Sequence, residues 1–319
     1  MSEAYAQRAI GAVVGSAVGD ALGAPFEFGP AGQYSARFPE PVLDGTGEMT
    51  GGGGFSWLPG EFTDDTQMAI LQAESLLDCG GFEGADLFDR FRIWALDAPD
   101  VGVQTSAALR SGLPWDQAAT NHFRRTGRAA GNGSIMRAAP TAVWAASLPI
   151  EQNVALAVAT AGVTHGDPAA GWGTAILHRM IAAALHDNDP WVALSAAISA
   201  LPPGQELFAE MLVPNWTPSD SNLPNGTVWT CLAQAVWSVR RAATFEEAVT
   251  AVIDLGDDTD TVAAVAGGLA GAMWGAEAIP QRWTSRLHGR LTTRAGVSSY
   301  DHADLVDLTH RLLAAAPTS

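Results

Sequence analysis

The chain of 319 residues contains no lysine, so all 17 of its basic residues are arginine. This absence excludes mechanisms that need a lysine, such as a Schiff base, a pyridoxal phosphate site or a Walker-A phosphate loop. Positive charge is scarce overall, because 34 acidic residues give a formal charge of −17. Wrapping a nucleic-acid backbone needs a basic face, so we expect no extended nucleic-acid binding. A small nucleotide ligand is still allowed, since a few arginines or backbone N–H groups can hold it.

Cysteine is nearly absent as well. Cys79 and Cys231 are far apart and form neither a disulfide framework nor a zinc cluster. No N-terminal stretch joins a basic segment to an apolar core and a cleavage site, and the uncharged run 261–276 is too short to span a bilayer. We therefore expect a cytoplasmic protein that does not associate with membranes.

Apolar residues recur at spacings of three and four, which is typical of helices. No run of alternating β-branched residues is flanked by hairpin turns, so a sheet-based fold is not expected. We predict an all-α fold, a single compact multi-helix domain over residues 1–319, with two irregular proline-rich stretches at 29–62 and 202–226. The predicted helices span residues 4–20, 64–79, 84–97, 103–112, 151–163, 169–186, 190–200, 227–242, 245–253, 259–276 and 302–315.

Two of these helices carry glycine at every fourth position. Each glycine costs about 1 kcal/mol relative to alanine inside a helix, so two such stripes need a structural reason. The spacing places the glycines on one helix face, where two backbones can approach closely. We predict that both helices lie at the centre of one bundle, where they can pack against each other. The stripes are Gly11, Gly15, Gly19 and Gly23, and Gly267, Gly271 and Gly275.

Two acidic clusters precede apolar helical patterns. They are Thr63-Asp-Asp-Thr66 and Asp257-Asp-Thr-Asp-Thr261. Capping explains one such residue per helix, but neighbouring carboxylates repel each other unless a cation or a proton relieves them. Carboxylate and hydroxyl oxygens suit Mg²⁺ or Mn²⁺, and two divalent cations would balance four carboxylates. Those four belong to Asp64, Asp65, Asp258 and Asp260.

Weaker signals lie elsewhere. The run Gly131-Asn-Gly-Ser134 offers successive backbone N–H groups that can cradle a phosphate, although a glycine-rich surface turn is the simpler interpretation. Glu27, Asp100 and His165 are each isolated in sequence. Taken one at a time, they are typical of a solvated carboxylate, a turn-capping aspartate and a structural histidine.

Together these motifs resemble the ADP-ribosylglycohydrolase family, which includes dinitrogenase reductase-activating glycohydrolase and the ADP-ribosylarginine hydrolases. The resemblance follows the order of the family's motifs over most of the chain. Its segments are the glycine-rich opening from Ala9 to Glu27, Phe62-Thr-Asp-Asp-Thr-Gln-Met68, Gly131-Asn-Gly-Ser-Ile-Met-Arg137, Thr164-His165 and Asp258-Thr-Asp-Thr261. One departure is Asp257, where the family usually has glycine; the extra carboxylate could tighten ion binding or raise a neighbour's pKa.

The resemblance implies a binuclear Mg²⁺ or Mn²⁺ centre in an all-α fold. The implied metal ligands are Thr63, Asp64, Asp65, Asp258, Asp260 and Thr261. The implied substrate-binding residues are Gly131, Asn132, Gly133, Ser134 and Met136, with the loop near the ADP-ribose diphosphate, and His165, which with Glu27 lies beside the distal ribose. The implied catalytic residues are Glu27, Asp64, Asp100 and Asp258.

The implied reaction is hydrolysis of the bond between C1 of the distal ribose in ADP-ribose and an acceptor, with ADP-ribosylated protein as substrate. Arginine is the first expectation for the acceptor. Serine, O-acetyl-ADP-ribose and a nucleic-acid adduct stay open, as does the choice between Glu27 and Asp100 as acid or base. Two other classes are also open: a non-catalytic ADP-ribose binder, and an all-α Mg²⁺-dependent diphosphate enzyme of the prenyl-synthase kind.

Overall fold

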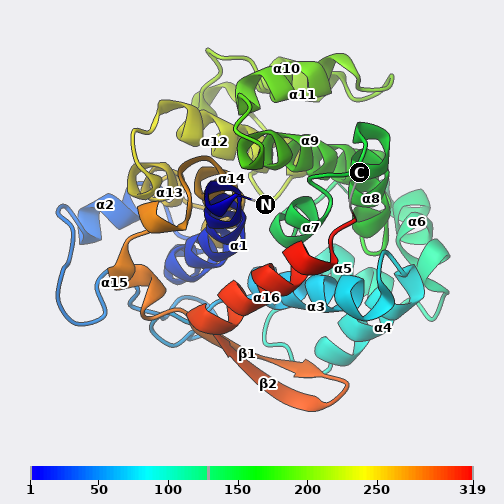
Figure 1. Cartoon of the computed structure of the whole chain (residues 1–319), viewed down its shortest axis with the longest axis horizontal. Coiled ribbons are helices and arrows are strands. Elements are labelled where there is room, and N and C mark those ends of the chain that lie inside the picture. Colours follow the sequence, from blue (N-terminus) through cyan, green and yellow to red (C-terminus); the bar gives the residue numbers. More distant parts are fainter. Residues whose placement is uncertain (1, 128–129, 318–319) are drawn as a thin grey trace.

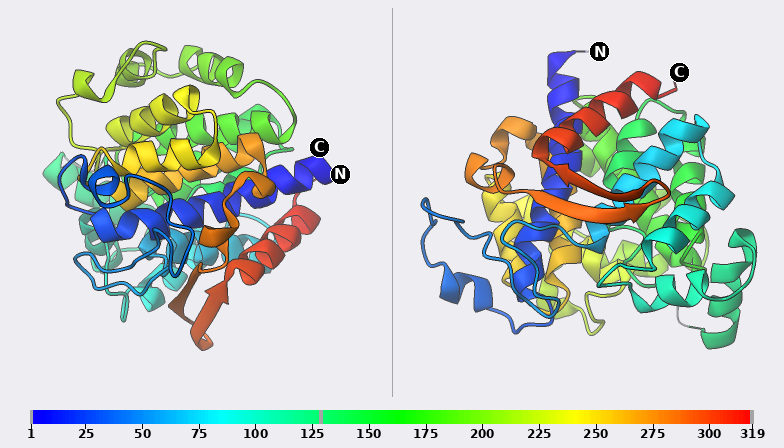
Figure 2. Two further views of the ribbon diagram at one scale, coloured as in Figure 1. Left: turned by 90° about the vertical axis from the view of Figure 1, so that its left-hand side faces the viewer. Right: turned by 90° about the horizontal axis from the view of Figure 1, so that it is seen from below.

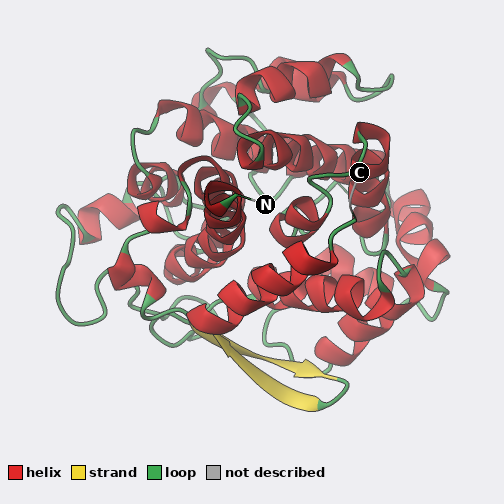
Figure 3. Ribbon diagram, in the orientation of Figure 1, coloured by secondary structure: helices red, strands yellow, loops and turns green. Residues whose placement is uncertain are grey.

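The structure is a computed structural model that describes residues 2–127 and 130–317. Helices dominate these residues, which confirms the predicted all-α fold class (Figure 3). The α-helices are α1 (Glu3–Gly23), α2 (Gln33–Arg37), α3 (Asp64–Cys79), α4 (Gly84–Trp94), α5 (Val103–Leu109), α6 (Trp115–Thr126), α7 (Ala139–Trp144), α8 (Ile150–Gly162), α9 (Pro168–Leu185), α10 (Pro190–Ser199), α11 (Glu206–Met211), α12 (Val228–Arg241), α13 (Phe245–Ile253), α14 (Thr259–Trp274), α15 (Gln281–Thr284) and α16 (His302–Ala315).

The two glycine-striped helices, α1 and α14, pack directly against each other and run antiparallel (Figure 1). A Cβ atom added to Gly15 would lie 2.5 Å from the backbone oxygen of Gly267, and one added to Gly19 would overlap the backbone oxygen of Ala263. The contact is therefore backbone against backbone, which only glycine permits. The predicted pairing of the two stripes is confirmed.

Other helices surround this central pair. Helices α12, α13 and α9 pack on α14, while α16, α7 and α3 pack on α1 (Figures 1 and 2). The segment Glu3–Phe26 is long and apolar enough to cross a bilayer, but 94% of its apolar window is buried inside the protein. Burial on all sides by other helices is what the central helix of a helical core requires, and it explains the apolar composition of α1.

Several elements differ from the sequence prediction. Residues His288–Thr293 (β1) and Gly296–Asp301 (β2) form an antiparallel hairpin at the periphery, although no hairpin was expected (Figure 3). Its alternation is weak, because β2 has no fully buried side chain and Val297 is exposed. The two stretches expected to be irregular also contain short helices, α2 and α11. Helices α6, α7 and α15 were not predicted either.

The antiparallel packing determines where the acidic clusters meet. The C-terminal end of α1 lies beside the N-terminus of α14, since a Cβ on Gly23 would contact the backbone of Thr259 and Asp260. The first residues of α3 also approach α1 there, because the Thr63 backbone N–H donates to Asp20 of α1. Both acidic helix N-termini therefore converge at one end of the central pair.

Candidate active site and metal centre

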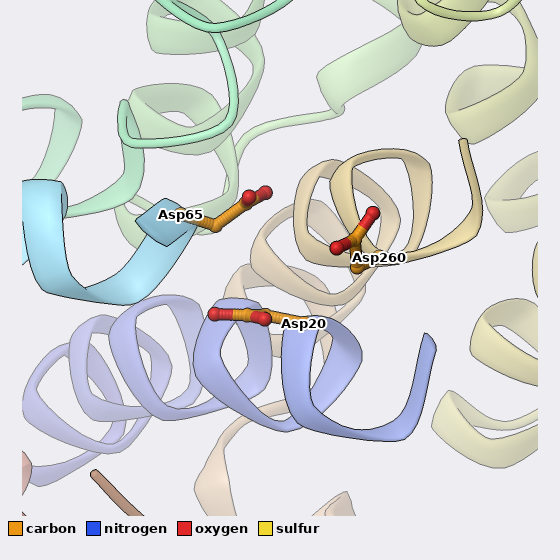
Figure 4. A group of neighbouring side chains, drawn as sticks. All are labelled: Asp20, Asp65 and Asp260. Carbon is orange, nitrogen blue, oxygen red and sulfur yellow. The ribbon is translucent and has the colours of Figure 1, made fainter. Parts of the chain in front are cut away.

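Carboxylates from three helices point into one space (Figure 4). Oxygen atoms of Asp20, Asp65 and Asp260 lie within 4.8 Å of one another, and so do those of Glu27, Asp258 and Asp260. Asp260 is common to both groups, so the two clusters form one continuous acidic site. The sequence analysis predicted that the two acidic helix N-termini meet at one site. In the structure they lie side by side.

Asp20 was missed by the sequence analysis. Its side chain is fully buried in α1, where its carboxylate accepts hydrogen bonds from the Thr63 N–H at 3.0 Å, the Thr66 N–H at 3.1 Å and the Thr66 hydroxyl at 2.5 Å. These bonds satisfy backbone donors at the start of α3, which no helical carbonyl can reach. The available signal was the one charged residue, Asp20, in the otherwise uncharged part of α1 over residues 9–23.

Burial raises the pKa of every carboxyl group in this cluster. It raises the pKa of Asp20 to about 6, although the hydrogen bonds from Thr66 and Thr63 oppose the shift. The pKa values of Asp64, Asp65 and Asp260 rise well above normal, first through burial and then through repulsion by neighbouring carboxylates. A site of this kind is strained when all of its carboxylates are ionised, so it favours a bound cation or a proton.

The residues present fit divalent cations. Oδ1 of Asp65 and Oε2 of Glu27 are buried and have no hydrogen-bond partner among the described residues. The carboxylate and hydroxyl groups of the cluster supply oxygen atoms, the ligands that Mg²⁺ and Mn²⁺ prefer. The Thr63 hydroxyl lies 3.4 Å from Asp65 Oδ2, and the Thr261 backbone N–H donates to Asp260 Oδ1 at 2.8 Å. The predicted threonines therefore lie next to the carboxylates they were grouped with.

The acidic cluster opens into a cavity of about 340 Å³. Most of the predicted site residues line it; Thr63 and Ser134 do not. Ser134 is buried, and its hydroxyl donates to the Ala170 carbonyl of α9 at 3.3 Å, so its side chain is directed away from the cavity. The predicted residues that line the cavity are Glu27, Asp64, Asp65, Asp100, Gly131, Asn132, Gly133, Met136, His165, Asp258, Asp260 and Thr261.

The glycine-rich loop is tied to the second acidic cluster. The Asn132 amide donates to Asp258 Oδ2 at 2.7 Å and to the Asn225 carbonyl at 3.1 Å. Asn225 is itself buried, and its side-chain oxygen accepts the Asp258 N–H at 3.1 Å. Asn225 was not predicted; it lies in the proline-rich stretch 202–226, where its turn sequence gave no sign of a role. The two asparagines fix the loop and Asp258 relative to each other.

The backbone conformation at Asp257 explains why the family usually has glycine at this position. Its φ angle is +64°, in the left-handed region that favours glycine, and its side chain is exposed. The Asp257 carbonyl accepts the Phe28 N–H at 2.7 Å, and its N–H donates to the Gly29 carbonyl at 2.9 Å. This bridge holds the Glu27 segment beside Asp258. Burial has the largest effect on the pKa of Asp258 and raises it; hydrogen bonds, that of Asn132 first, lower it, and the Asp257 charge raises it by less.

The cavity mouth combines acidic and apolar groups. Burial, together with repulsion by Asp100, Asp258 and Asp20, raises the pKa of Glu27 to about 8. Burial and Asp258 likewise raise the pKa of Asp100. Phe28 and Val103 line the same cavity and are largely exposed, so apolar side chains share the cavity with the two carboxylates. A cavity of similar size, about 320 Å³, lies beside β1 but contains none of the predicted residues.

Fold and cavity together define an all-α protein with an acidic site suited to divalent cations. The family model for ADP-ribosylglycohydrolase matches residues 1–318. An ADP-ribosylarginine hydrolase, Tri1, from Pseudomonas putida (strain GB-1) is 31% identical, over 96% of this chain and 81% of its own. An ADP-ribosyl-[dinitrogen reductase] glycohydrolase from Rhodospirillum rubrum is 30% identical, over 88% of this chain and 90% of its own.

A solved structure agrees with these sequence matches. It is described as an ADP-ribosylglycohydrolase-related protein complex and superimposes with a TM-score of 0.76 at 32% identity, over 99% of this chain and all of the other. The chain belongs to the ADP-ribosylglycohydrolase family, as its motifs implied, and is an ADP-ribosyl glycohydrolase. Membership of this family excludes the alternative of a prenyl-synthase-like diphosphate enzyme.

Proposed function

We propose that the protein is a metal-dependent hydrolase that removes ADP-ribose from ADP-ribosylated arginine on protein. The observation that carries the proposal is the convergence of two acidic helix N-termini and a glycine-rich loop on one cavity. Relatives named for ADP-ribosylarginine and for ADP-ribosyl-[dinitrogen reductase] support protein substrates, and the acidic mouth suits a cationic guanidinium. We further propose that residues 1–319 act as one catalytic domain in the cytoplasm.

The residues that would hold two Mg²⁺ or Mn²⁺ ions are Thr63, Asp64, Asp65, Asp258, Asp260 and Thr261. When bound, such ions neutralise the carboxylates and polarise the oxygen atoms of the ribose and of a nearby water molecule. The diphosphate would lie beside Gly131, Asn132 and Gly133, which line the cavity. The N–H groups of Gly131 and Asn132 donate to Gln104 Oε1 at 3.3 Å and to the Gly226 carbonyl at 3.1 Å, so they hold the loop in place and do not bind phosphate. Asn132 keeps this loop in register with Asp258 through its amide hydrogen bond.

Glu27 is our candidate for the general acid. A carboxyl group with a pKa near 8 holds its proton at neutral pH and can give it to the leaving guanidine nitrogen as the bond to C1 breaks. Divalent cations bound next to Glu27 would lower this pKa from about 8 toward neutrality, which suits proton exchange at pH 7. The oxygen of water then bonds to C1, and Asp100 accepts the water proton. Ionised carboxylates nearby stabilise the oxocarbenium character that such bond cleavage develops.

The test is the release of ADP-ribose from an ADP-ribosylated arginine peptide, a serine peptide and O-acetyl-ADP-ribose, each with Mg²⁺, Mn²⁺ or EDTA. We expect turnover of the arginine substrate that EDTA abolishes. Asp64→Asn and Asp258→Asn should reduce turnover by at least a thousandfold and weaken cation binding. Asp257→Asn is the matched control, because it removes an adjacent carboxylate whose side chain is exposed and does not line the cavity.

Three results would overturn parts of this proposal separately. Full activity in EDTA would refute the role of the metal. Faster turnover of the serine or O-acetyl substrate would refute arginine as the acceptor. ADP-ribose binding without turnover of any substrate would instead favour the non-catalytic alternative.

A further inference from the structure

Arg137 is a buried cation that contacts the backbone of the glycine-rich loop at residues 131–134. Its side chain is fully buried, and the face of the Phe91 ring lies 4.8 Å from its guanidinium carbon. Its Nη1 group donates to the Gly133 carbonyl at 2.6 Å. Its remaining hydrogen bonds also go to neutral oxygens: Nε to Gln72 Oε1 at 3.1 Å, and Nη2 to the Thr160 carbonyl at 3.2 Å and to Thr164 Oγ1 at 2.8 Å.

Thr164 links this guanidinium to the imidazole of His165. Thr164 Oγ1 accepts a hydrogen bond from Arg137, and it lies 2.9 Å from His165 Nδ1. A guanidinium can only donate, so Thr164 has its single hydroxyl proton left to donate. In the described part of the chain, Nδ1 is the acceptor that this hydroxyl contacts. This arrangement favours Nδ1 as the acceptor, with the proton of the neutral imidazole on Nε2.

The other edge of the His165 ring faces the glycine-rich loop. A Cβ on Gly133 would lie 2.9 Å from Cε1 and 3.2 Å from Nε2 of His165, and both residues line the cavity. No hydrogen bond joins Nε2 to a described residue, whereas Nδ1 is occupied. Burial and the nearby Arg137 lower the pKa of His165 to about 3, which agrees with a neutral ring.

We propose that Arg137 and Thr164 are positioning residues that hold His165 as the neutral Nε2–H tautomer, so that it donates a hydrogen bond to an oxygen of the bound ADP-ribose. The same guanidinium fixes the Gly133 carbonyl and so holds the loop and the imidazole in one arrangement. This inference rests on the proposed function only for the ligand, because the tautomer is a property of the free protein. It gives Arg137 a role that its complete burial without a carboxylate hydrogen-bond partner would otherwise leave unexplained.

The test uses Thr164→Val, which replaces the hydroxyl by a methyl group of similar size. Substitution of Arg137 itself would leave several buried acceptors without donors and could prevent folding. Long-range ¹H–¹⁵N NMR spectra of the ¹⁵N-histidine-labelled protein report which ring nitrogen carries the proton, and His165→Gln assigns the signal. We expect Nε2–H in the wild type, and a mixture of tautomers with about tenfold weaker ADP-ribose binding in Thr164→Val.

Thr164→Ser restores the hydroxyl and should restore both readouts. Thr309→Val is the matched control, because Thr309 is equally buried but its hydroxyl donates only to the Leu305 carbonyl within α16. A wild-type His165 protonated on Nδ1, or a Thr164→Val variant with an unchanged tautomer and affinity, would overturn the inference. Absence of ADP-ribose binding by the folded wild type would instead count against the proposed function, while the NMR result would still decide the tautomer.

Discussion

At the scale of single residues, Asp20 of α1 holds the N-terminus of α3 in place beside the acidic site through its hydrogen bonds. We predict that Asp20→Asn lowers the free energy of unfolding by roughly 2–4 kcal/mol in the presence of Mg²⁺, because it removes a buried ionic acceptor of three hydrogen bonds. Its amide would also place a donor against the N–H groups of α3. Urea unfolding with and without Mg²⁺ measures the loss.

Asp254→Asn is the control for this substitution. The Asp254 carboxylate also accepts a backbone N–H and a hydroxyl, both from Ser35, but at a site that is partly exposed to water. We expect this change to cost about 1 kcal/mol or less. An equal loss in the two variants would show that burial beneath the acidic cluster adds nothing to the role of Asp20.

Asp257 offers a second test at the residue scale. Its positive φ angle is unfavourable for a residue with a Cβ atom, so Asp257→Gly should stabilise the protein by about 1 kcal/mol. The reverse change at the preceding position, Gly256→Ala, should destabilise it, because φ is +77° and the new Cβ would lie 2.6 Å from the Ala31 nitrogen. Thermal unfolding of both variants decides; a loss of stability in Asp257→Gly would contradict the backbone explanation.

At the scale of elements, the contact between α1 and α14 determines the position of the site. Gly15→Ala would force the two backbones apart, since its Cβ would lie 2.5 Å from the Gly267 oxygen. We predict a loss of about 3 kcal/mol, at the upper end of the usual range for overpacked cores, together with weaker binding of divalent cations. Gly162→Ala in α8 is the control: nothing lies near its Cβ, and it should stabilise by about 0.5–1 kcal/mol. Chemical unfolding and Mn²⁺ titration of both variants provide the readouts, and an unaffected Gly15→Ala would contradict close packing.

The comparison of sequence and structure is clearest for these elements. Glycine at every fourth position has few explanations in a soluble helix, so the pairing of α1 and α14 could be predicted, as could the meeting of the two acidic N-termini. The hairpin could not, because only Leu291 of β1 and no residue of β2 shows a strongly apolar, buried position. Asn225 and Arg137 could not be assigned roles either, since their partners are distant in sequence and only the fold brings them together.

At the scale of the whole molecule, buried histidines make stability depend on pH. His178 is fully buried, its Nε2 lies 2.9 Å from Thr141 Oγ1, and burial lowers its pKa to about 3. The unfolded chain, with a histidine pKa near 6.5, therefore binds a proton that the folded protein rejects between pH 6.5 and 3. The contribution of neutral His178 to the free energy of unfolding is fully present above pH 6.5, and it is lost as the pH decreases from 6.5 toward 3.

We predict that the wild type loses about 2 kcal/mol more than His178→Gln between pH 7 and pH 5. The raised pKa values of the site carboxylates act in the opposite direction, but they are common to both proteins and cancel in the difference. Urea unfolding at the two pH values gives the result. Parallel pH profiles for the two proteins would mean that His178 is already protonated in the folded state.

The central claim is that residues far apart in the chain, on α3 and α14, jointly hold two divalent cations at the floor of one cavity. The most direct measurement is anomalous diffraction at the manganese edge from crystals grown in millimolar Mn²⁺. We predict two peaks between Asp65 and Asp260, and their loss in Asp260→Asn. Diffraction at the same Mn²⁺ concentration with no anomalous peak between these two helix N-termini would contradict the account.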